Sequence, residues 1–273
     1  MSITINTNTA SLLAQQSLSR TQEQLSQTIN RLSTGQRINT AKDDAAGLAI
    51  AEGMSAQSRG IKQGGRNGND GISLIQTAEG GLNQTLALLQ RMRELASQAS
   101  TGTYATADLA NIDTEYQSLM TEIDRVAATV DFNGTDLLNS AATISVQVGA
   151  NNTVNDRLDI TLLDVTTATL AITSDTTTNG NAQTALGLID DAIKTVTTGL
   201  ATLGASHSKI EAAVNGNSDR VTNLEAARSR IVDTDFAEES ANLAKLQILQ
   251  QAGANMLSQA NSSGQIALKL LQG

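Results

Sequence analysis

The chain has 273 residues and a net charge of −9, with no cysteine, no proline, no tryptophan and one histidine, His207. The absence of cysteine excludes disulfides and Cys/His zinc sites, and a Ser-His-Asp group would depend on His207 alone. The negative charge argues against nucleic acid as the main partner. We therefore expect no enzyme activity, no catalytic residue, no cofactor and no metal.

Two further features of the composition favour long helices over a pocketed fold. Aromatic residues make up 1% of the chain, so the core is built from Leu, Ile, Val and Ala. Without proline, no helix is interrupted by a missing backbone donor.

No apolar stretch reaches the roughly 20 residues of a membrane span, so we expect no membrane insertion. Residues 1–6 lack the charged and apolar regions of a Sec signal peptide, and we expect any export to use another route.

Residues 18–32 predict the first helix. Its apolar residues recur at steps of three, four or seven and form one seam: Leu18, Leu25, Ile29 and Leu32. Gly35 is a typical C-terminal stop, and Asp43 and Asp44 are expected in the first turn of the next helix. The glycines at 60, 64, 65, 68 and 71 match neither a dinucleotide fingerprint nor a P-loop, and they indicate a helix break or a tight packing site.

Residues 82–96 predict a helix with two apolar stripes. One stripe consists of Leu82, Leu86, Leu89 and Ala96, and the other of Leu88, Met92 and Leu95. A helix that is apolar on two faces is buried on two sides. We therefore expect one stripe to face the internal bundle and the other to contact a neighbouring subunit.

Two longer stretches have heptad spacing. The first is uninterrupted: Leu109, Ile112, Tyr116, Leu119, Ile123, Val126 and Val130. The second runs from Leu186 to Ile231, with polar residues in three of its slots: His207, Asn217 and Arg228. A pattern this long indicates a coiled-coil helix, in which His207 is a tolerated polar core residue.

Between these stretches, residues 140–180 predict a small β-hairpin region. Residues 144–148 and 158–162 alternate strictly between apolar and polar side chains, and a turn-rich segment separates them. The Thr-rich segment that follows is expected as strand or loop. We expect the only sheet of the protein here.

The last helix is predicted from residue 236. Asp235 and Glu238 form a capping-box pattern, which we favour over a cation site built from Asp233, Asp235, Glu238 and Glu239. The seam of this helix consists of apolar and small residues: Leu243, Leu246, Leu249, Gly253, Met256, Ala260, Ala267 and Leu270.

The distribution of charge suggests two domains. Residues 1–41 carry +2, residues 236–273 carry zero and the remainder carries −11. We expect residues 1–42 and 236–273 to pair as an inner core of terminal helices, and residues 43–235 to form an outer helical bundle that faces water. The predicted fold class is mainly α, a long antiparallel helical coiled-coil bundle with a small β-hairpin region near the middle of the chain.

Further motifs lie in the segments 34–50, 66–73, 132–138, 147–151, 203–205, 229–235 and 246–261. These motifs resemble those of bacterial flagellin. The resemblance covers about residues 1–150 and 185–273. The chain departs from many flagellins in having at most about forty residues of variable middle segment. It also has Gly264-Gln265 where many members have a proline before the glutamine.

The resemblance implies a subunit that polymerises with itself into the extracellular flagellar filament for swimming motility. It implies type III export without a cleaved signal, and an export chaperone, a cap protein and hook-associated proteins as partners. Both termini would be disordered in the monomer and would fold on assembly. The alternatives are a hook–filament junction protein and a surface adhesin role for residues 140–180. A protease insertion is excluded, because a His-Glu-x-x-His motif needs two histidines.

The resemblance also implies a recognition surface. Residues 89–96 are similar to the flagellin segment recognised by the vertebrate Toll-like flagellin receptor, and Glu115 matches its acidic partner. By this resemblance Arg91, Leu95 and Glu115 are the central contacts, with Gln90 beside them. The same surface is expected to pack subunits along a filament.

Overall fold

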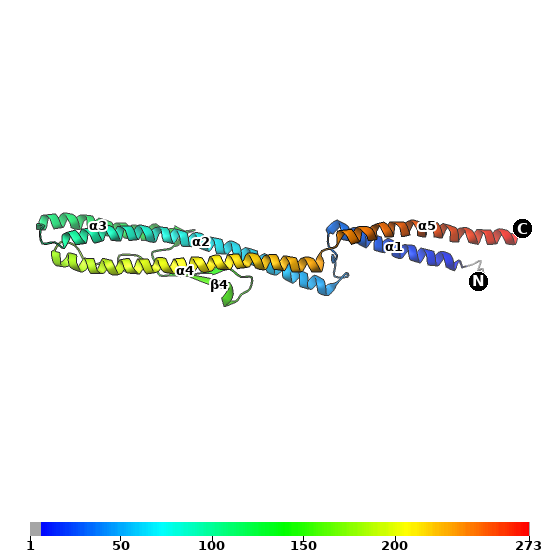
Figure 1. Ribbon diagram of the computed structural model, residues 1–273, viewed down its shortest axis with the longest axis horizontal. Coiled ribbons are helices and arrows are strands. Elements are labelled where there is room, and N and C mark those ends of the chain that lie inside the picture. Colours follow the sequence, from blue (N-terminus) through cyan, green and yellow to red (C-terminus); the bar gives the residue numbers. More distant parts are fainter. Residues whose placement is uncertain (1–6, 273) are drawn as a thin grey trace. The chain divides into compact units, whose positions relative to one another are not determined.

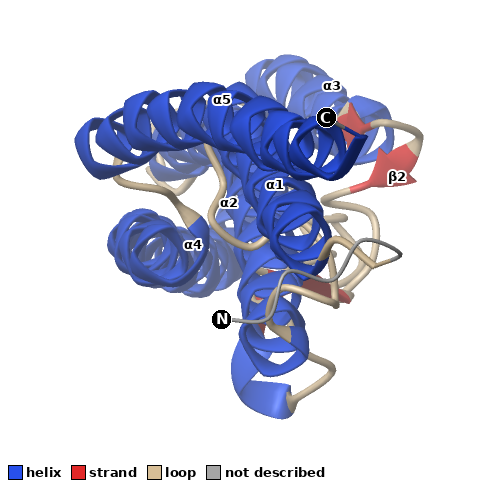
Figure 2. Cartoon of the chain, turned by 90° about the vertical axis from the view of Figure 1, so that its right-hand side faces the viewer, coloured by secondary structure: helices blue, strands red, loops and turns tan. Residues whose placement is uncertain are grey.

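The computed structural model describes the backbone of residues 7–272 and the side chains of residues 7–262. The predicted fold class is confirmed: the described chain is dominated by five long helices and contains two small antiparallel hairpins (Figure 2). It divides into two compact units. Unit 1 comprises residues 1–56 and 224–273, and unit 2 comprises residues 57–223.

Unit 2 is built on three helices that lie lengthwise beside one another (Figure 1). They are the part of α2 (Ala45–Ala99) within this unit, α3 (Thr106–Thr129), and the corresponding part of α4 (Asn179–Val232). The strands are short, and a single 3₁₀ turn precedes the last of them: β1 (Asp131–Phe132), β2 (Thr135–Asp136), β3 (Thr143–Gln147), η1 (Val154–Asp156) and β4 (Arg157–Thr161).

The core of unit 2 encloses α2 on two sides. Tyr116 and Ile123 of α3 and Ile189 and Val196 of α4 belong to one continuous buried cluster with α2. Both apolar stripes of α2 therefore lie inside a single chain, and Met92 and Leu95 are buried. The expectation that the second stripe contacts a neighbouring subunit is wrong, because α3 and α4 already cover both faces of the helix.

The predicted hairpin at 140–180 is confirmed. Strands β3 and β4 pair antiparallel, with Ile144 opposite Ile160 and Val146 opposite Leu158. The expectation of a single sheet is wrong, since β1 pairs with β2 in a second, two-residue ladder. Its turn is Asn133-Gly134, with φ values of 52° and 77°. Asn-Gly is the preferred pair for a two-residue hairpin turn, so the sequence contained a signal for this element.

The glycines of α2 do not break the helix, which is continuous from Ala45 to Ala99. They allow the backbone after β3 to approach it, and a Cβ at Gly64 would collide with the carbonyl of Val148. Two amides fix the same segment: Asn67 of α2 donates to Gln147 O at 3.0 Å, and Asn217 of α4 donates to Val148 O at 2.7 Å. Asn217, one of the polar residues in the heptad pattern, thus holds the segment that follows β3 against α4.

The Thr-rich segment between β4 and α4 is a loop held to α3 by carboxylates. Asp124 accepts hydrogen bonds from the backbone and hydroxyl of Thr167 at 2.8 and 2.9 Å. Asp113 accepts the corresponding pair from Thr176 at 2.8 and 3.2 Å. Four hydrogen bonds therefore satisfy loop groups that no sheet could satisfy.

Unit 1 is organised around two helices, α1 (Thr9–Thr34) and α5 (Phe236–Gln272), which lie side by side (Figure 1). The predicted stop at Gly35 is confirmed, since this residue has φ 70° and its N–H donates to Arg31 O. The α2 helix begins after Asp44, whose side chain accepts from Gly47 N, so Asp43 and Asp44 precede the helix and do not lie in its first turn. Asp235 accepts from the N–H groups of Ala237 and Glu238 and so caps the start of α5.

Replacing Gly64 by alanine tests the close approach of the strand end to α2. We expect Gly64→Ala to lower the free energy of unfolding by about 1–3 kcal/mol, because the backbone of Val148 must move. The matched control is Gly65→Ala, where a Cβ would meet nothing within 4 Å. That variant should gain up to about 1 kcal/mol from helix propensity. Equal effects of the two changes on denaturant unfolding would contradict the packing.

Replacing Tyr116 tests the buried phenol of α3. Its hydroxyl is buried without a hydrogen-bond partner among the described residues, and burial, with the charges of Asp113 and Asp175, raises its pKa to about 12. Because the pKa of Tyr116 is higher in the folded chain than in the unfolded chain, the neutral phenol contributes to folding stability in full below pH 10. This contribution to stability is lost as the pH rises from 10 to 12. We expect Tyr116→Phe to add about 1 kcal/mol of stability and to abolish this alkaline loss. Tyrosinate absorbance and chemical denaturation measure both effects, with Tyr104→Phe as the exposed control.

Candidate functional site

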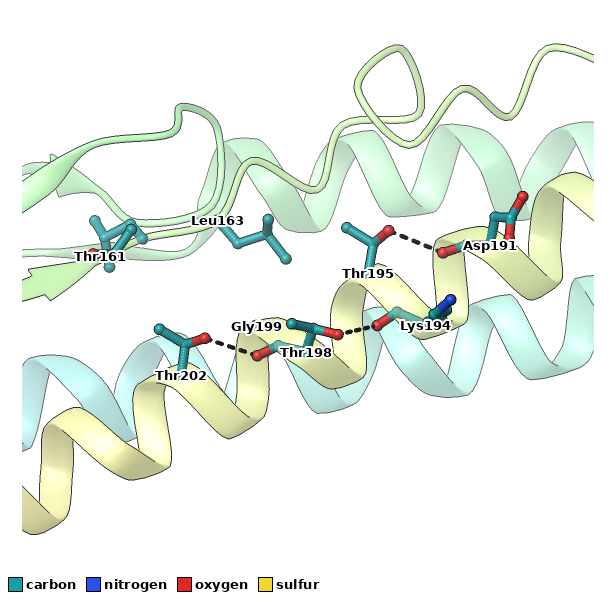
Figure 3. A pocket seen from close by; sticks show the side chains of 9 residues that line it. Thr161, Leu163, Asp191, Lys194, Thr195, Thr198, Gly199 and Thr202 are labelled. Atoms are coloured by element: carbon teal, nitrogen blue, oxygen red, sulfur yellow. Dashed lines mark hydrogen bonds between the residues drawn. The ribbon is translucent and has the colours of Figure 1, made fainter.

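The described residues were compared with the needs of a metal site and of a nucleophile. They contain no group of three His, Asp or Glu side chains that could hold a metal ion. A cavity of about 490 Å³ lies between the segment after β4 and the face of α4 (Figure 3). The hydroxyls of Thr195, Thr198 and Thr202 donate to carbonyls one turn earlier in α4, at 2.8–3.0 Å. These hydroxyls are therefore engaged in the helix and present no activated nucleophile.

A charged cluster joins α2 to α3 at the predicted recognition surface. Arg91 donates from Nε and Nη2 to Oε1 of Glu115 at 3.1 and 2.8 Å, and from Nη1 to Oε2 of Glu94 at 3.0 Å. The hydrogen bond with Glu115 is the main cause that raises the pKa of Arg91 above its ordinary value. Arg91 and Glu115 are half-exposed, so the cluster presents an ordered arrangement of charges to solvent.

The other two predicted surface residues differ from each other. Gln90 is exposed beside the cluster, whereas Leu95 retains only 3% of its surface and belongs to the core of unit 2. Leu95 points into the same bundle that encloses Met92 and Ala96. The structure therefore brings Gln90, Arg91 and Glu115 together at the surface and places Leu95 beneath it.

A second ion pair on α2 was not predicted from the sequence. Arg93 donates from Nε to Oδ1 of Asp190 on α4 at 2.6 Å, which raises the pKa of Arg93 and lowers that of Asp190. The two residues are 97 positions apart, and nothing in the local pattern links them. Arg91 and Arg93 thus tie α2 to a different neighbour each.

The terminal helices form an antiparallel pair. Asn8 donates to the carbonyl of Ala260 at 2.9 Å, and Gln250 donates to Gln22 at 2.6 Å. Positions near the start of α1 therefore face positions near the end of α5. Leu18 lies against Gly253, where a Cβ would be 3.3 Å from its Cδ1. This contact shows why a small residue occupies the seam of α5.

The predicted seam residues separate into two groups. Leu25 and Leu246 are buried, and Leu18, Leu32 and Leu243 are partly buried. By contrast, 49% of Ile29, 46% of Leu249 and 66% of Met256 are exposed. The side chain of Leu270 lies outside the described residues. Leu12, Leu13 and Ile248 are also exposed, so α1 and α5 carry apolar side chains on faces that they do not bury against each other.

Among the described residues, no helix combines the length and apolarity that a membrane span needs.

Two family models match the chain. The bacterial flagellin N-terminal helical region matches residues 5–143, and the bacterial flagellin C-terminal helical region matches residues 186–271. A flagellin of Halalkalibacterium halodurans is 43% identical over 270 residues, which cover 98% of this chain and 99% of that protein. The unmatched segment coincides with the second hairpin and the Thr-rich loop.

Solved structures agree with this similarity. The crystal structure of Bacillus cereus flagellin is 29% identical, with a TM-score of 0.51, and covers 60% of this chain and 94% of its own. A Vibrio parahaemolyticus protein assigned as flagellar hook-associated has a TM-score of 0.58 at 14% identity, covering 70% of this chain and 100% of its own, which shows the fold alone. Taken with the family models, these similarities show that the chain belongs to the bacterial flagellin family, whose members are structural filament subunits and not enzymes.

Proposed function

We propose that the chain polymerises into the extracellular flagellar filament through its terminal helices. The observation that carries this proposal is the exposed apolar surface of α1 and α5. Ile29, Leu249 and Met256 are each about half or more exposed in the single chain. Several exposed apolar side chains on the same two paired helices favour an interface with a partner. Residues 1–41 and 236–273 also carry little net charge, so bringing copies together costs little electrostatic repulsion.

We further propose the two domains expected from the sequence, with residues 1–42 and 236–273 as the inner core and residues 43–235 as the outer bundle. The helices α1 and α5 supply the assembly surface. The outer part carries the acidic charge, which favours solubility on the water-facing side of a polymer. The terminal pair, with one partner for each helix, is the part most stabilised by assembly.

Export completes this proposal. The subunit travels through the flagellar type III apparatus with an export chaperone on its C-terminal helix and is added beneath a cap protein above the hook-associated proteins. The exposed apolar residues of α5, such as Ile248 and Leu249, are the kind of surface that a chaperone must cover before assembly. Family membership and this surface support the proposal.

A hook–filament junction role is the nearest alternative, and the similarity of fold at 14% identity is the observation behind it. A junction protein assembles in a short zone and does not form long filaments. An adhesin role for residues 140–180 has one supporting feature: Val154, in the loop between β3 and β4, is 88% exposed. Electron microscopy of seeded protein separates the first alternative from a filament subunit, and deletion of the segment tests attachment.

Removing the exposed apolar groups of α5 tests the assembly surface. We expect Leu249→Gln with Met256→Gln to raise the critical concentration for seeded polymerisation at least tenfold, since burying one such side chain is worth about 1.5–3 kcal/mol. The monomer should unfold as before, because both side chains are already exposed. Sedimentation of the polymer measures the effect.

Val154→Gln, at an apolar position of unit 2 that is 88% exposed, is the control and should polymerise like the parent chain. Truncation provides the stricter test. Polymerisation that survives the loss of both 1–42 and 236–273 would overturn the assembly model.

The charged cluster on α2 and α3 supports a second proposal. We propose that Gln90, Arg91 and Glu115, with Leu95 beneath them, contribute to subunit packing and are read by the vertebrate Toll-like flagellin receptor. The hydrogen bonds of Arg91 hold its guanidinium in place before any partner arrives. Preorganised charged groups lose less conformational freedom on binding.

Reversing the charge of Arg91 tests this proposal. We expect Arg91→Asp to weaken receptor activation by the monomer about tenfold or more, the scale of a central interface residue, and to impair motility. A receptor reporter assay on refolded monomer and a swimming assay measure the two effects.

The charge-swapped variant Arg91→Glu with Glu115→Arg is the control for internal cohesion. This variant restores an ion pair between positions 91 and 115 but exchanges the positive and the negative charge. Receptor activation should therefore stay low, while the unfolding temperature returns toward that of the parent chain. Parental signalling from a folded Arg91→Asp monomer would remove the recognition proposal.

A further inference from the structure

The antiparallel pair of terminal helices contains a charge pair between Arg31, whose side chain is 29% exposed, and the buried Glu239, and this pair is incomplete among the described residues. The Nη1 of Arg31 on α1 lies 3.9 Å from Oε1 of Glu239 on α5, too far for a hydrogen bond. Only 9% of the Glu239 side chain is exposed. Among the described residues, Nε of Arg31 and Oε1 of Glu239 have no hydrogen-bond partner although both atoms are buried.

Unpaired polar atoms of this kind are unfavourable. A buried charge is tolerated when hydrogen bonds satisfy it, and a lone buried carboxylate oxygen or guanidinium N–H loses its hydration without compensation. Neighbouring polar groups in unit 1 are well satisfied by contrast, as the capping bonds of Asp235 show. The Arg31–Glu239 pair therefore requires an additional group.

Space for such a group lies beside the pair. A cavity of about 360 Å³ is lined by polar residues of both helices, among them Arg31, Glu239, Asn242 and Lys245, and by Leu246 and Leu249. One water occupies about 30 Å³ of liquid, so the cavity has room for the end group of a side chain. Its lining includes the half-exposed Leu249, one of the apolar residues proposed above for assembly.

The two unpaired atoms define the chemistry of the occupant. It must accept a hydrogen bond from Nε of Arg31 and donate one to Oε1 of Glu239. A carboxylate would place a second negative charge beside Glu239, and an ammonium would lie among Arg31 and Lys245 and accept nothing. A carboxamide is neutral and has both a carbonyl oxygen and an NH₂ group, so it matches both atoms.

The chain itself supplies such groups. Gln15 and Gln16 of α1 and Gln247 and Gln251 of α5 are exposed on the same low-charge helix pair. We infer that the Arg31–Glu239 cavity receives a side-chain carboxamide from a second copy of this chain, which completes the pair between subunits. The inference rests on the proposed function, polymerisation through α1 and α5, and it assigns a specific polar contact to that surface.

The test replaces the pair by an apolar one in the full chain. Arg31→Leu with Glu239→Leu removes both unpaired atoms, and exchanges of buried ion pairs for apolar residues are often neutral or stabilising. We expect the monomer to keep its helix content and unfolding temperature, and the critical concentration of seeded polymerisation to rise about tenfold, the scale of a lost hydrogen bond to a charged group. A critical concentration equal to that of the parent chain would overturn the inference.

A second measurement does not depend on the stability of that variant. The chain has no cysteine, so a single Asn242→Cys reports on the cavity, and Glu238→Cys, exposed on the same helix outside the cavity lining, is its matched control. We expect the thiol at 242 to react with a maleimide in the monomer and to be protected at least tenfold in the filament, and the thiol at 238 to change less. Equal reactivity of position 242 in both states, or equal protection of both positions, would overturn the inference.

The parent chain separates this inference from the proposed function. If the parent fails to polymerise from seeds, the proposed function fails and the inference fails with it. If the parent polymerises while either the leucine pair or the thiol at 242 behaves as though nothing enters the cavity, only the inference is overturned.

Discussion

The structure depends on the burial of α2 on two faces. A chain with almost no aromatic residues gains little from any one side chain, so it needs long, continuous apolar seams, and the absence of proline permits them. Residues of α3 and α4 cover both stripes of α2 and form one core cluster. Because α2 is enclosed in this way, its solvent-facing side carries charged residues. Arg91 pairs with Glu115 of α3, and Arg93 pairs with Asp190 of α4.

The enclosure of α2 also explains why particular polar side chains of unit 2 hold the segment between α3 and α4. Once the helices are fixed, the irregular segment between α3 and α4 must find hydrogen bonds on their surfaces. Asn67 and Asn217 hold the strand end after β3, and Asp113 and Asp124 hold the Thr-rich loop. Each anchor satisfies backbone groups that would otherwise be buried without partners. These contacts add little apolar burial but select one arrangement of the loop over others.

In unit 1 the apolar faces of the long helices are buried only in part. Its two long helices pack against each other, and α5 keeps Leu249 and Met256 exposed. Two atoms of the Arg31–Glu239 pair have no hydrogen-bond partner among the described residues. In unit 2, by contrast, a third helix covers the second stripe of α2. The deficits of unit 1 are thus both apolar and polar, and we propose that a neighbouring subunit supplies contacts for both. This difference between the two units supports the proposal that the terminal helices carry the assembly surface.

The helices could be predicted from their heptad spacing, because a pattern that continues over tens of residues leaves few alternatives. The stop at Gly35 and the hairpin of β3 and β4 also had local signals. Which face of each helix is covered depends on the packing of segments that are distant in the chain. The tertiary structure placed Leu95 in the core, left Ile29 and Met256 exposed within predicted seams, and joined Arg93 to Asp190 across 97 positions. Periodicity states that a face is apolar, but the partner that covers it depends on contacts between distant segments. The small ladder at Asn133-Gly134 had a local signal in its turn, whereas the Arg31–Glu239 pair had none, because its two residues lie at opposite ends of the chain.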